Sequence, residues 1–153
     1  SPGPTWRPHS RSQRVWWEVC WEVCWGVWRW SSGCSDQLGA LGAEVVRDPM
    51  RVECCGAYMG VSKPGTIRVR ASAIHGSARS SGAEALATMC PLCAHNLDAV
   101  GPQPDEPALV VFYFTQLVAL ALGAPPEQCL AATQRIDPRP LLHAKGLLEE
   151  PVP

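Results

Sequence analysis

The 153-residue sequence predicts an α/β fold with a short parallel sheet flanked by helices. Helix-like and strand-like segments alternate along residues 35–122, and such alternation favours parallel strands joined by crossover helices. Residues 108–114 form an apolar run typical of a parallel strand that is buried on both faces. A pair of cysteines follows each of two earlier strand-like segments. We therefore expect the cysteine loops at C-terminal strand ends, where α/β folds place their sites.

The elements before the first cysteine pair are short. Ser35 and Asp36 can cap a helix that runs to about Gly42. Residues 43–46 then resemble a short strand, and a loop containing Pro49 leads to the double cysteine.

A longer helix is predicted between the two cysteine pairs, over residues 66–80. Its apolar positions Ile67, Ala71 and Ile74 follow helical spacing, and Gly82 suits the end of a helix. The next strand is expected at residues 84–89.

The second cysteine pair opens another helix, because Pro91 is tolerated in a first helical turn. After the strand at 108–114, Thr115 is expected to cap a helix over residues 116–122. The tail from Asp137 has few apolar residues, so we expect it to contribute little to a core and to dock on a partner.

Residues 1–34 differ from the rest of the chain in composition. All seven tryptophans lie within residues 1–30, without a clean helical or strand periodicity. We interpret residues 1–34 as a low-complexity segment that is disordered or irregular and is not native coding sequence, and residues 35–150 as one domain. Glu18 and Glu22 interrupt the apolar stretch, so no membrane span is predicted. The net charge of −1 favours no nucleic-acid partner.

Two cysteine pairs carry the chemistry of the sequence. Cys54 and Cys55 precede Gly56, and after a gap of 33 residues Cys90 and Cys93 form a Cys-x-x-Cys turn. Thiolates are soft ligands that suit zinc, copper(I) and iron–sulfur clusters. Adjacent side chains on an extended chain point in opposite directions, so a multi-iron cluster accommodates the double cysteine more easily than one tetrahedral zinc. Zinc, a disulfide and inert thiols remain alternatives.

These motifs resemble the cysteine-rich CCG domain of the heterodisulfide reductase family, in the C-terminal half of its CCG-bearing subunit only. Three further stretches carry the resemblance in the right order: residues 90–98 (Cys-Pro-Leu-Cys-Ala-His-Asn-Leu-Asp), residues 113–123, and residues 137–147. The resemblance implies a non-cubane 4Fe–4S cluster held by five cysteines. Four of those positions match Cys54, Cys55, Cys90 and Cys93. The fifth should lie upstream, where Cys20 has a compatible spacing but a different sequence context, so we treat Cys20 as a coincidence.

The resemblance also implies a function. The chain would be an oxidoreductase subunit that passes electrons to a disulfide such as the coenzyme M–coenzyme B heterodisulfide. Its partners would be a ferredoxin-like iron–sulfur subunit and a flavin subunit. The reduced-thiol chemistry of the cysteines separately favours a cytoplasmic location. The family's CCG-bearing subunit carries two such domains, so this single domain is not expected to act alone. No catalytic side chain is identified.

Two alternatives remain from the sequence. One is a CCG-domain iron–sulfur subunit of a glycolate- or lactate-oxidising complex, although Pro91-Leu92 and Asn96-Leu97-Asp98 favour the heterodisulfide reductase branch. The other is a zinc-stabilised structural module, which would be colourless where an iron–sulfur protein is brown.

Overall fold

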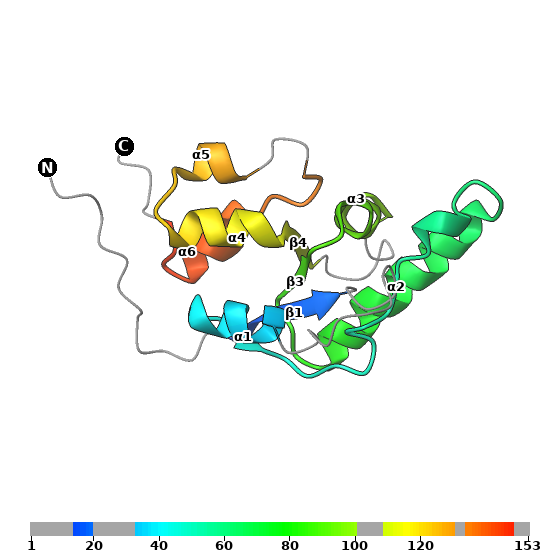
Figure 1. Ribbon diagram of the computed structural model, residues 1–153, viewed down its shortest axis with the longest axis horizontal. Coiled ribbons are helices and arrows are strands. Elements are labelled where there is room, and N and C mark those ends of the chain that lie inside the picture. The colour runs from blue at the N-terminus through cyan, green and yellow to red at the C-terminus, as the bar shows by residue number, and fades with distance from the viewer. Residues whose placement is uncertain (1–13, 20–32, 101–108, 131–133, 149–153) are drawn as a thin grey trace, which may run out of the picture.

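The computed structural model describes residues 14–19, 33–100, 109–130 and 134–148. Its centre is a four-stranded parallel sheet with the strand order β2-β1-β3-β4. Strands β1, β3 and β4 are labelled in Figure 1. The strands are β1 (Arg14–Val19), β2 (Glu44–Val45), β3 (Ala85–Thr88) and β4 (Val110–Tyr113). The helices are α1 (Gly33–Ala40), the 3-10 helix η1 (Ala57–Met59), α2 (Pro64–Ser80), α3 (Pro91–Val100), α4 (Phe114–Ala121), α5 (Pro126–Cys129) and α6 (Arg139–Ala144). The predicted short parallel sheet flanked by helices is confirmed.

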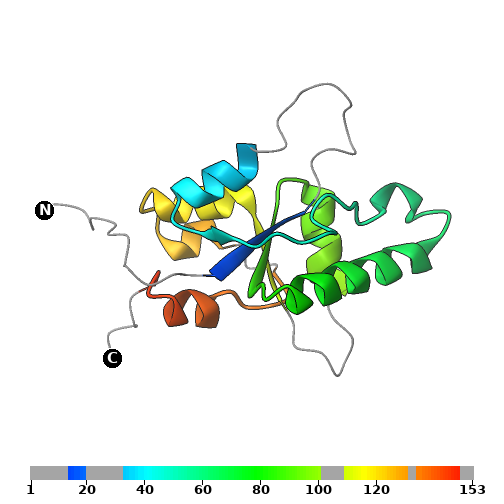
Figure 2. The same cartoon turned by 90° about the horizontal axis from the view of Figure 1, so that it is seen from below.

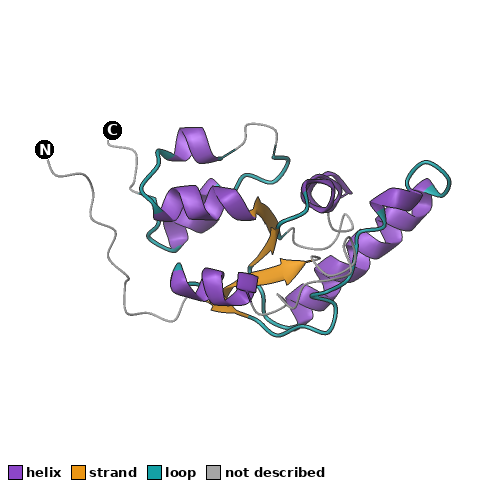
Figure 3. Cartoon of the chain, viewed as in Figure 1, coloured by secondary structure: helices purple, strands orange, loops and turns teal. Residues whose placement is uncertain are grey.

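Helices cover both faces of the sheet (Figure 3). Because successive side chains of a strand point to opposite faces, β3 and β4 each contribute to two apolar clusters. On one face, Leu86 and Val111 pack with residues of α2 and α3, including Ile74 and Leu97. The other cluster joins strand residues to α1, α4 and α6, and its buried members are Leu38, Ala85, Ala87, Val110, Phe112, Leu117 and Leu142. In Figure 2, α2 extends away from the sheet on the side opposite α6.

Most predicted elements appear close to their expected positions. The helix expected at 66–80 begins at Pro64, since proline is favoured in the first turn, and it ends at Ser80 before Gly82 with φ 84°. The expected cap at Thr115 is wrong. Helix α4 begins at Phe114, and the backbone N–H of Tyr113 donates to Gln116 Oε1 at 2.8 Å. Glutamine at the third helical position thereby satisfies the N-cap N–H.

The structure differs from the expected irregularity of residues 1–34 at two places. Arg14–Val19 forms β1, an interior strand paired in parallel with β2 and β3, and α1 begins at Gly33. The segment is rich in valine and tryptophan, residues that favour strands when neighbouring strands are present. Residues 1–13 and 20–32 lie outside the described residues.

The C-terminal tail contributes to the core of the domain, although little core was expected there. Leu142 in α6 is only 1% exposed and belongs to the apolar cluster with Phe112 and Leu117. Ile136, Leu141 and Leu148 pack against the same cluster. The few apolar residues of the tail therefore serve the core of this domain. Within the described part of the chain, no helix has the length and apolar character needed to cross a membrane.

Candidate metal centre

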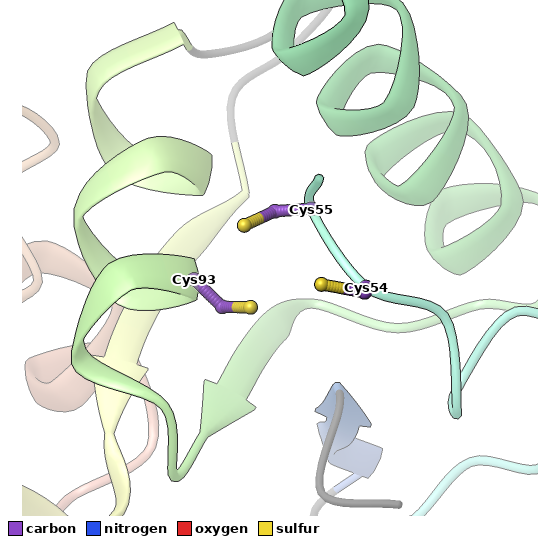
Figure 4. A group of neighbouring side chains, drawn as sticks. All are labelled: Cys54, Cys55 and Cys93. Atoms are coloured by element: carbon purple, nitrogen blue, oxygen red, sulfur yellow. The ribbon is translucent and has the colours of Figure 1, made fainter. Parts of the chain in front are cut away.

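Three cysteines meet beside the C-terminal end of β3. Cys54 and Cys55 come from the loop after β2, and Cys93 lies in the first turn of α3, which follows β3 closely. Their sulfur atoms all lie within 4.8 Å of one another and point toward a common centre (Figure 4). Cys54 is 9% exposed, Cys93 1% and Cys55 0%. The fold therefore brings soft ligand atoms from two distant segments into one shielded group.

A buried carboxylate holds the loop that carries the double cysteine. Asp48 is 5% exposed and accepts the backbone N–H of Met50 at 2.7 Å. Its oxygens also accept the hydroxyl groups of Ser77, at 2.9 and 3.0 Å, and Ser81, at 2.5 Å. These two serines lie at the C-terminal end of α2, so Asp48 ties the loop to that helix. Buried polar groups are costly unless paired, and here each hydrogen bond also fixes the backbone before Cys54.

Arg70 of α2 fixes the double cysteine itself. Its Nε donates to the carbonyl oxygen of Cys54 at 2.7 Å, and its Nη2 donates to Glu53 Oε2 at 2.5 Å. Gly56 has φ 79°, in the left-handed region, and its N–H lies 3.4 Å from Cys54 Sγ as a donor. Glycine enters this region without the Cβ penalty, so it lets the chain turn directly after two sulfur-bearing residues. The turn explains how adjacent cysteines reach one centre.

Replacing Arg70 by methionine is expected to weaken metal retention about tenfold, as loss of outer-shell partners commonly does. Methionine keeps the packing of the side chain but frees Glu53 and the Cys54 carbonyl group. The Arg70 side chain is 39% exposed, so the free energy of unfolding should fall by only about 1 kcal/mol. The measurement is the metal left after a chelator challenge, together with thermal unfolding. Arg68→Met, at an exposed position of the same helix, is the control, and equal metal retention in both variants would contradict a role for Arg70.

The environment of Cys55 raises the pKa of its thiol. A hydrogen bond with Cys93 is the largest cause and burial is the second, while Asn96 acts in the opposite direction. Asn96 Nδ2 donates to Cys55 Sγ at 3.5 Å, and the sulfur contacts the carbonyl oxygen of Leu92 at 3.9 Å. With its pKa raised, the metal-free Cys55 is a protonated thiol at neutral pH. A metal that bound here would have to displace this proton, so metal affinity is expected to fall as pH is lowered.

Cys90 is not part of the three-sulfur group. It is partly buried, and its N–H donates to Thr88 Oγ1 at 3.2 Å in the turn between β3 and α3. Its role as a fourth ligand stays a prediction. Cys20 lies outside the described residues. Cys129 is a buried free thiol of α5 whose Sγ donates to the carbonyl oxygen of Ala124 at 3.6 Å.

Several other polar residues near the site serve the scaffold. His75 is fully buried, and its Nε2 lies 3.2 Å from the carbonyl oxygen of Leu97, so it packs between α2 and α3. Asp98 accepts the backbone N–H groups of Arg135 at 2.8 Å and Ile136 at 3.4 Å. This carboxylate connects the helix that bears Cys93 to the C-terminal segment. The 90–98 stretch singled out in the sequence therefore contains a residue, Asp98, that joins the site to the C-terminal segment.

The donor set fits a thiophilic metal centre. Three cysteine sulfurs face one another, and among the described residues no aspartate, glutamate or histidine joins them within that distance. Thiolate-only sites suit zinc, copper(I) and iron–sulfur clusters, whereas magnesium and calcium need oxygen ligands. Asn96 and Gly56 place N–H groups next to the sulfurs, as expected around thiolates that carry negative charge.

Comparison with known proteins agrees with this site. Residues 35–98 match the CCG family, described as a cysteine-rich domain. The chain is also similar to the 8-methylmenaquinol:fumarate reductase membrane anchor subunit of Wolinella succinogenes, with 34% identity over 94 residues. That similarity covers 58% of this chain and 33% of the relative, so the chain spans about a third of the relative's length. The expected CCG domain is confirmed, while this relative is named as a fumarate reductase subunit and not as a heterodisulfide reductase. Residues 35–98 thus match the family described as a CCG cysteine-rich domain.

Proposed function

We propose that the chain is an iron–sulfur electron-transfer subunit of a multi-subunit oxidoreductase. The observation that carries this proposal is the buried group formed by the sulfurs of Cys54, Cys55 and Cys93, within 4.8 Å of one another. In this proposal Cys90 is a fourth ligand, and the cofactor is a non-cubane 4Fe–4S cluster. The match of residues 35–98 to the CCG domain supports it.

When bound, such a cluster supplies one-electron transfer. The chain's own residues hold and shield the centre. Arg70 and Asp48 fix the loop of the double cysteine, and α3 presents Cys93. Asn96 donates a hydrogen bond to one of the sulfurs, and hydrogen bonds and burial are the means by which a protein sets a cluster's potential.

The resemblance to heterodisulfide reductase suggests a disulfide as the electron acceptor, for example the coenzyme M–coenzyme B heterodisulfide. Cleavage of that S–S bond consumes two electrons and two protons and yields two thiols, with the electrons coming from ferredoxin-like and flavin subunits. A cytoplasmic location, which suits reduced thiols, is part of this proposal.

A second candidate follows from the Wolinella succinogenes relative: a subunit of a quinol:fumarate reductase complex. Both candidates use the same metal centre and differ in the partner subunits.

Anaerobic expression of the full chain, followed by iron, sulfide and zinc analysis and an EPR spectrum, tests the proposal. About four irons with matching sulfide per chain are expected for the proposed cluster. Stoichiometric zinc without sulfide would overturn the redox proposal in favour of a structural zinc module. A chain that retains neither metal, although it is folded, would also overturn it.

Two further variants define the ligand set. Strand β1 ends at Val19, which pairs with Thr88, so β1 and β3 end at the same edge of the sheet. Cys20 is the next residue in the sequence. If Cys20 and Cys90 are ligands, Cys20→Ser and Cys90→Ser should each lower the iron content. Iron at the wild-type level in one of these variants would exclude that cysteine from the set.

A further inference from the structure

Asn96 contacts the three-sulfur group without belonging to it. Its Nδ2 donates to Cys55 Sγ at 3.5 Å. Asn96 is three residues beyond Cys93 in α3, and residues three apart lie on the same face of a helix. One face of α3 therefore supplies the Cys93 sulfur and, one turn later, the amide donor of Asn96. The sulfur that accepts this hydrogen bond belongs to Cys55, in a loop 41 residues earlier in the chain.

The surroundings of Cys55 make this donor important once a metal is bound. The side chain is fully buried, so water does not reach the sulfur. As a thiol, Cys55 also donates to the carbonyl oxygen of Leu92, at 3.9 Å, and that oxygen can only accept. A ligating thiolate has lost its proton and cannot donate to Leu92. The N–H of Asn96 can still donate, and a hydrogen bond to a charged acceptor is stronger than one to a neutral thiol.

We propose that Asn96 is a positioning residue of the metal centre, whose amide N–H orients the Cys55 sulfur and stabilises the negative charge on it. For the redox consequences this inference rests on the proposed iron–sulfur function. Hydrogen bonds to the sulfurs of a cluster stabilise its more negative, reduced form and so raise its reduction potential. Removing the donor should lower the potential and weaken metal binding about tenfold.

Two variants separate the donor from the space it fills. Asn96→Leu keeps a similar volume and removes the N–H group, and Asn96→Asp keeps the shape and adds a negative charge. His95→Leu, at the exposed neighbouring position, is the control. The first measurement is cobalt(II) titration of the metal-free full chain, followed by the visible absorption of cobalt–thiolate bonds. The second is the midpoint potential of the iron-loaded chain, followed by EPR.

The expected potentials decrease in the order wild type, Asn96→Leu, Asn96→Asp, and cobalt affinity falls about tenfold in Asn96→Leu. If Asn96 only filled space, its replacement would lower thermal stability without producing this order of midpoint potentials. Potentials and cobalt affinities equal to those of His95→Leu would overturn the inference while leaving the iron–sulfur proposal intact. A chain that takes up no iron but binds cobalt in an Asn96-dependent manner would have the opposite meaning: the positioning role stands and the proposed function fails.

Discussion

Replacing Cys93 by serine should remove most of the bound metal, whereas the same replacement at Cys129 should leave the metal content unchanged. Cys93 supplies one of three mutually close sulfurs, and it comes from a different segment than the other two. A serine hydroxyl is a hard, protonated group and a poor substitute for a soft thiolate. Because the two remaining sulfurs sit on adjacent residues of one loop, a metal bound to the variant would no longer be held from α3 as well. We expect at least about a tenfold loss of metal affinity.

Cys129 is a closely matched control for this experiment. It is a free thiol, 9% exposed, and it lies in α5 away from the three-sulfur group. Both replacements place a hydroxyl group in a buried position, so both carry a comparable cost of about 1–3 kcal/mol in the free energy of unfolding. Metal content per folded chain and thermal unfolding of the metal-free protein separate the two effects. Wild-type metal content in Cys93→Ser, or equal metal loss in both variants, would show that Cys93 is not a ligand.

The convergence of the cysteines could be predicted because it depends on topology. A loop after β2 and a turn after β3 leave a parallel sheet at the same edge, and the sequence shows both strands and both cysteine pairs. The same reasoning could not place Cys90. The spacing of a Cys-x-x-Cys turn allows both sulfurs to face one centre, but the hydrogen bond between Cys90 and Thr88 belongs to a local turn that spacing does not reveal.

The residues that fix the site could not be predicted from the sequence. Arg70 is one of several arginines on α2, and its contact with Cys54 spans 16 positions of the chain. Asp48 is a single acid in a loop, and its partners Ser77 and Ser81 lie 29 and 33 positions away. Such contacts depend on how α2 packs against the loop, and hydrophobic periodicity does not predict them. Arginine and aspartate are usually surface residues, so residue type alone predicts exposed positions for Arg70 and Asp48 and not a role beside the cysteines.

Strand β1 shows a different limit. Its sequence, Arg-Val-Trp-Trp-Glu-Val, has no strict alternation of apolar and polar residues, and it lies next to a repetitive tryptophan-rich stretch. Strand formation depends strongly on neighbouring strands, and β1 gains two of them because it lies between β2 and β3. A strand in a parallel sheet with helices on both faces needs no polar face (Figure 3). The absence of alternation therefore did not argue against an interior strand.

Replacing Gly56 by alanine should both destabilise the domain and reduce metal binding. The residue has φ 79°, which costs a residue with a Cβ about 1–2 kcal/mol. A Cβ at this position would also lie 3.1 Å from Arg70 Cδ, so the arginine must shift and its hydrogen bonds to Glu53 and the Cys54 carbonyl group weaken. We expect a total loss of about 2–3 kcal/mol in the free energy of unfolding, together with a fall in metal retention.

Two glycines of the same chain separate backbone strain from crowding at Gly56. Gly82 has φ 84° with nothing within 4 Å of an added Cβ, so Gly82→Ala should cost about 1–2 kcal/mol and leave metal retention unchanged. Gly65 lies in the first turn of α2, also with nothing within 4 Å, so Gly65→Ala should be neutral or stabilise by about 0.4–1 kcal/mol. Thermal unfolding and metal content of the three variants give the comparison. If Gly56→Ala behaves like Gly82→Ala in both measurements, the close approach of Arg70 has no role in the metal centre, and the left-handed turn alone accounts for the glycine.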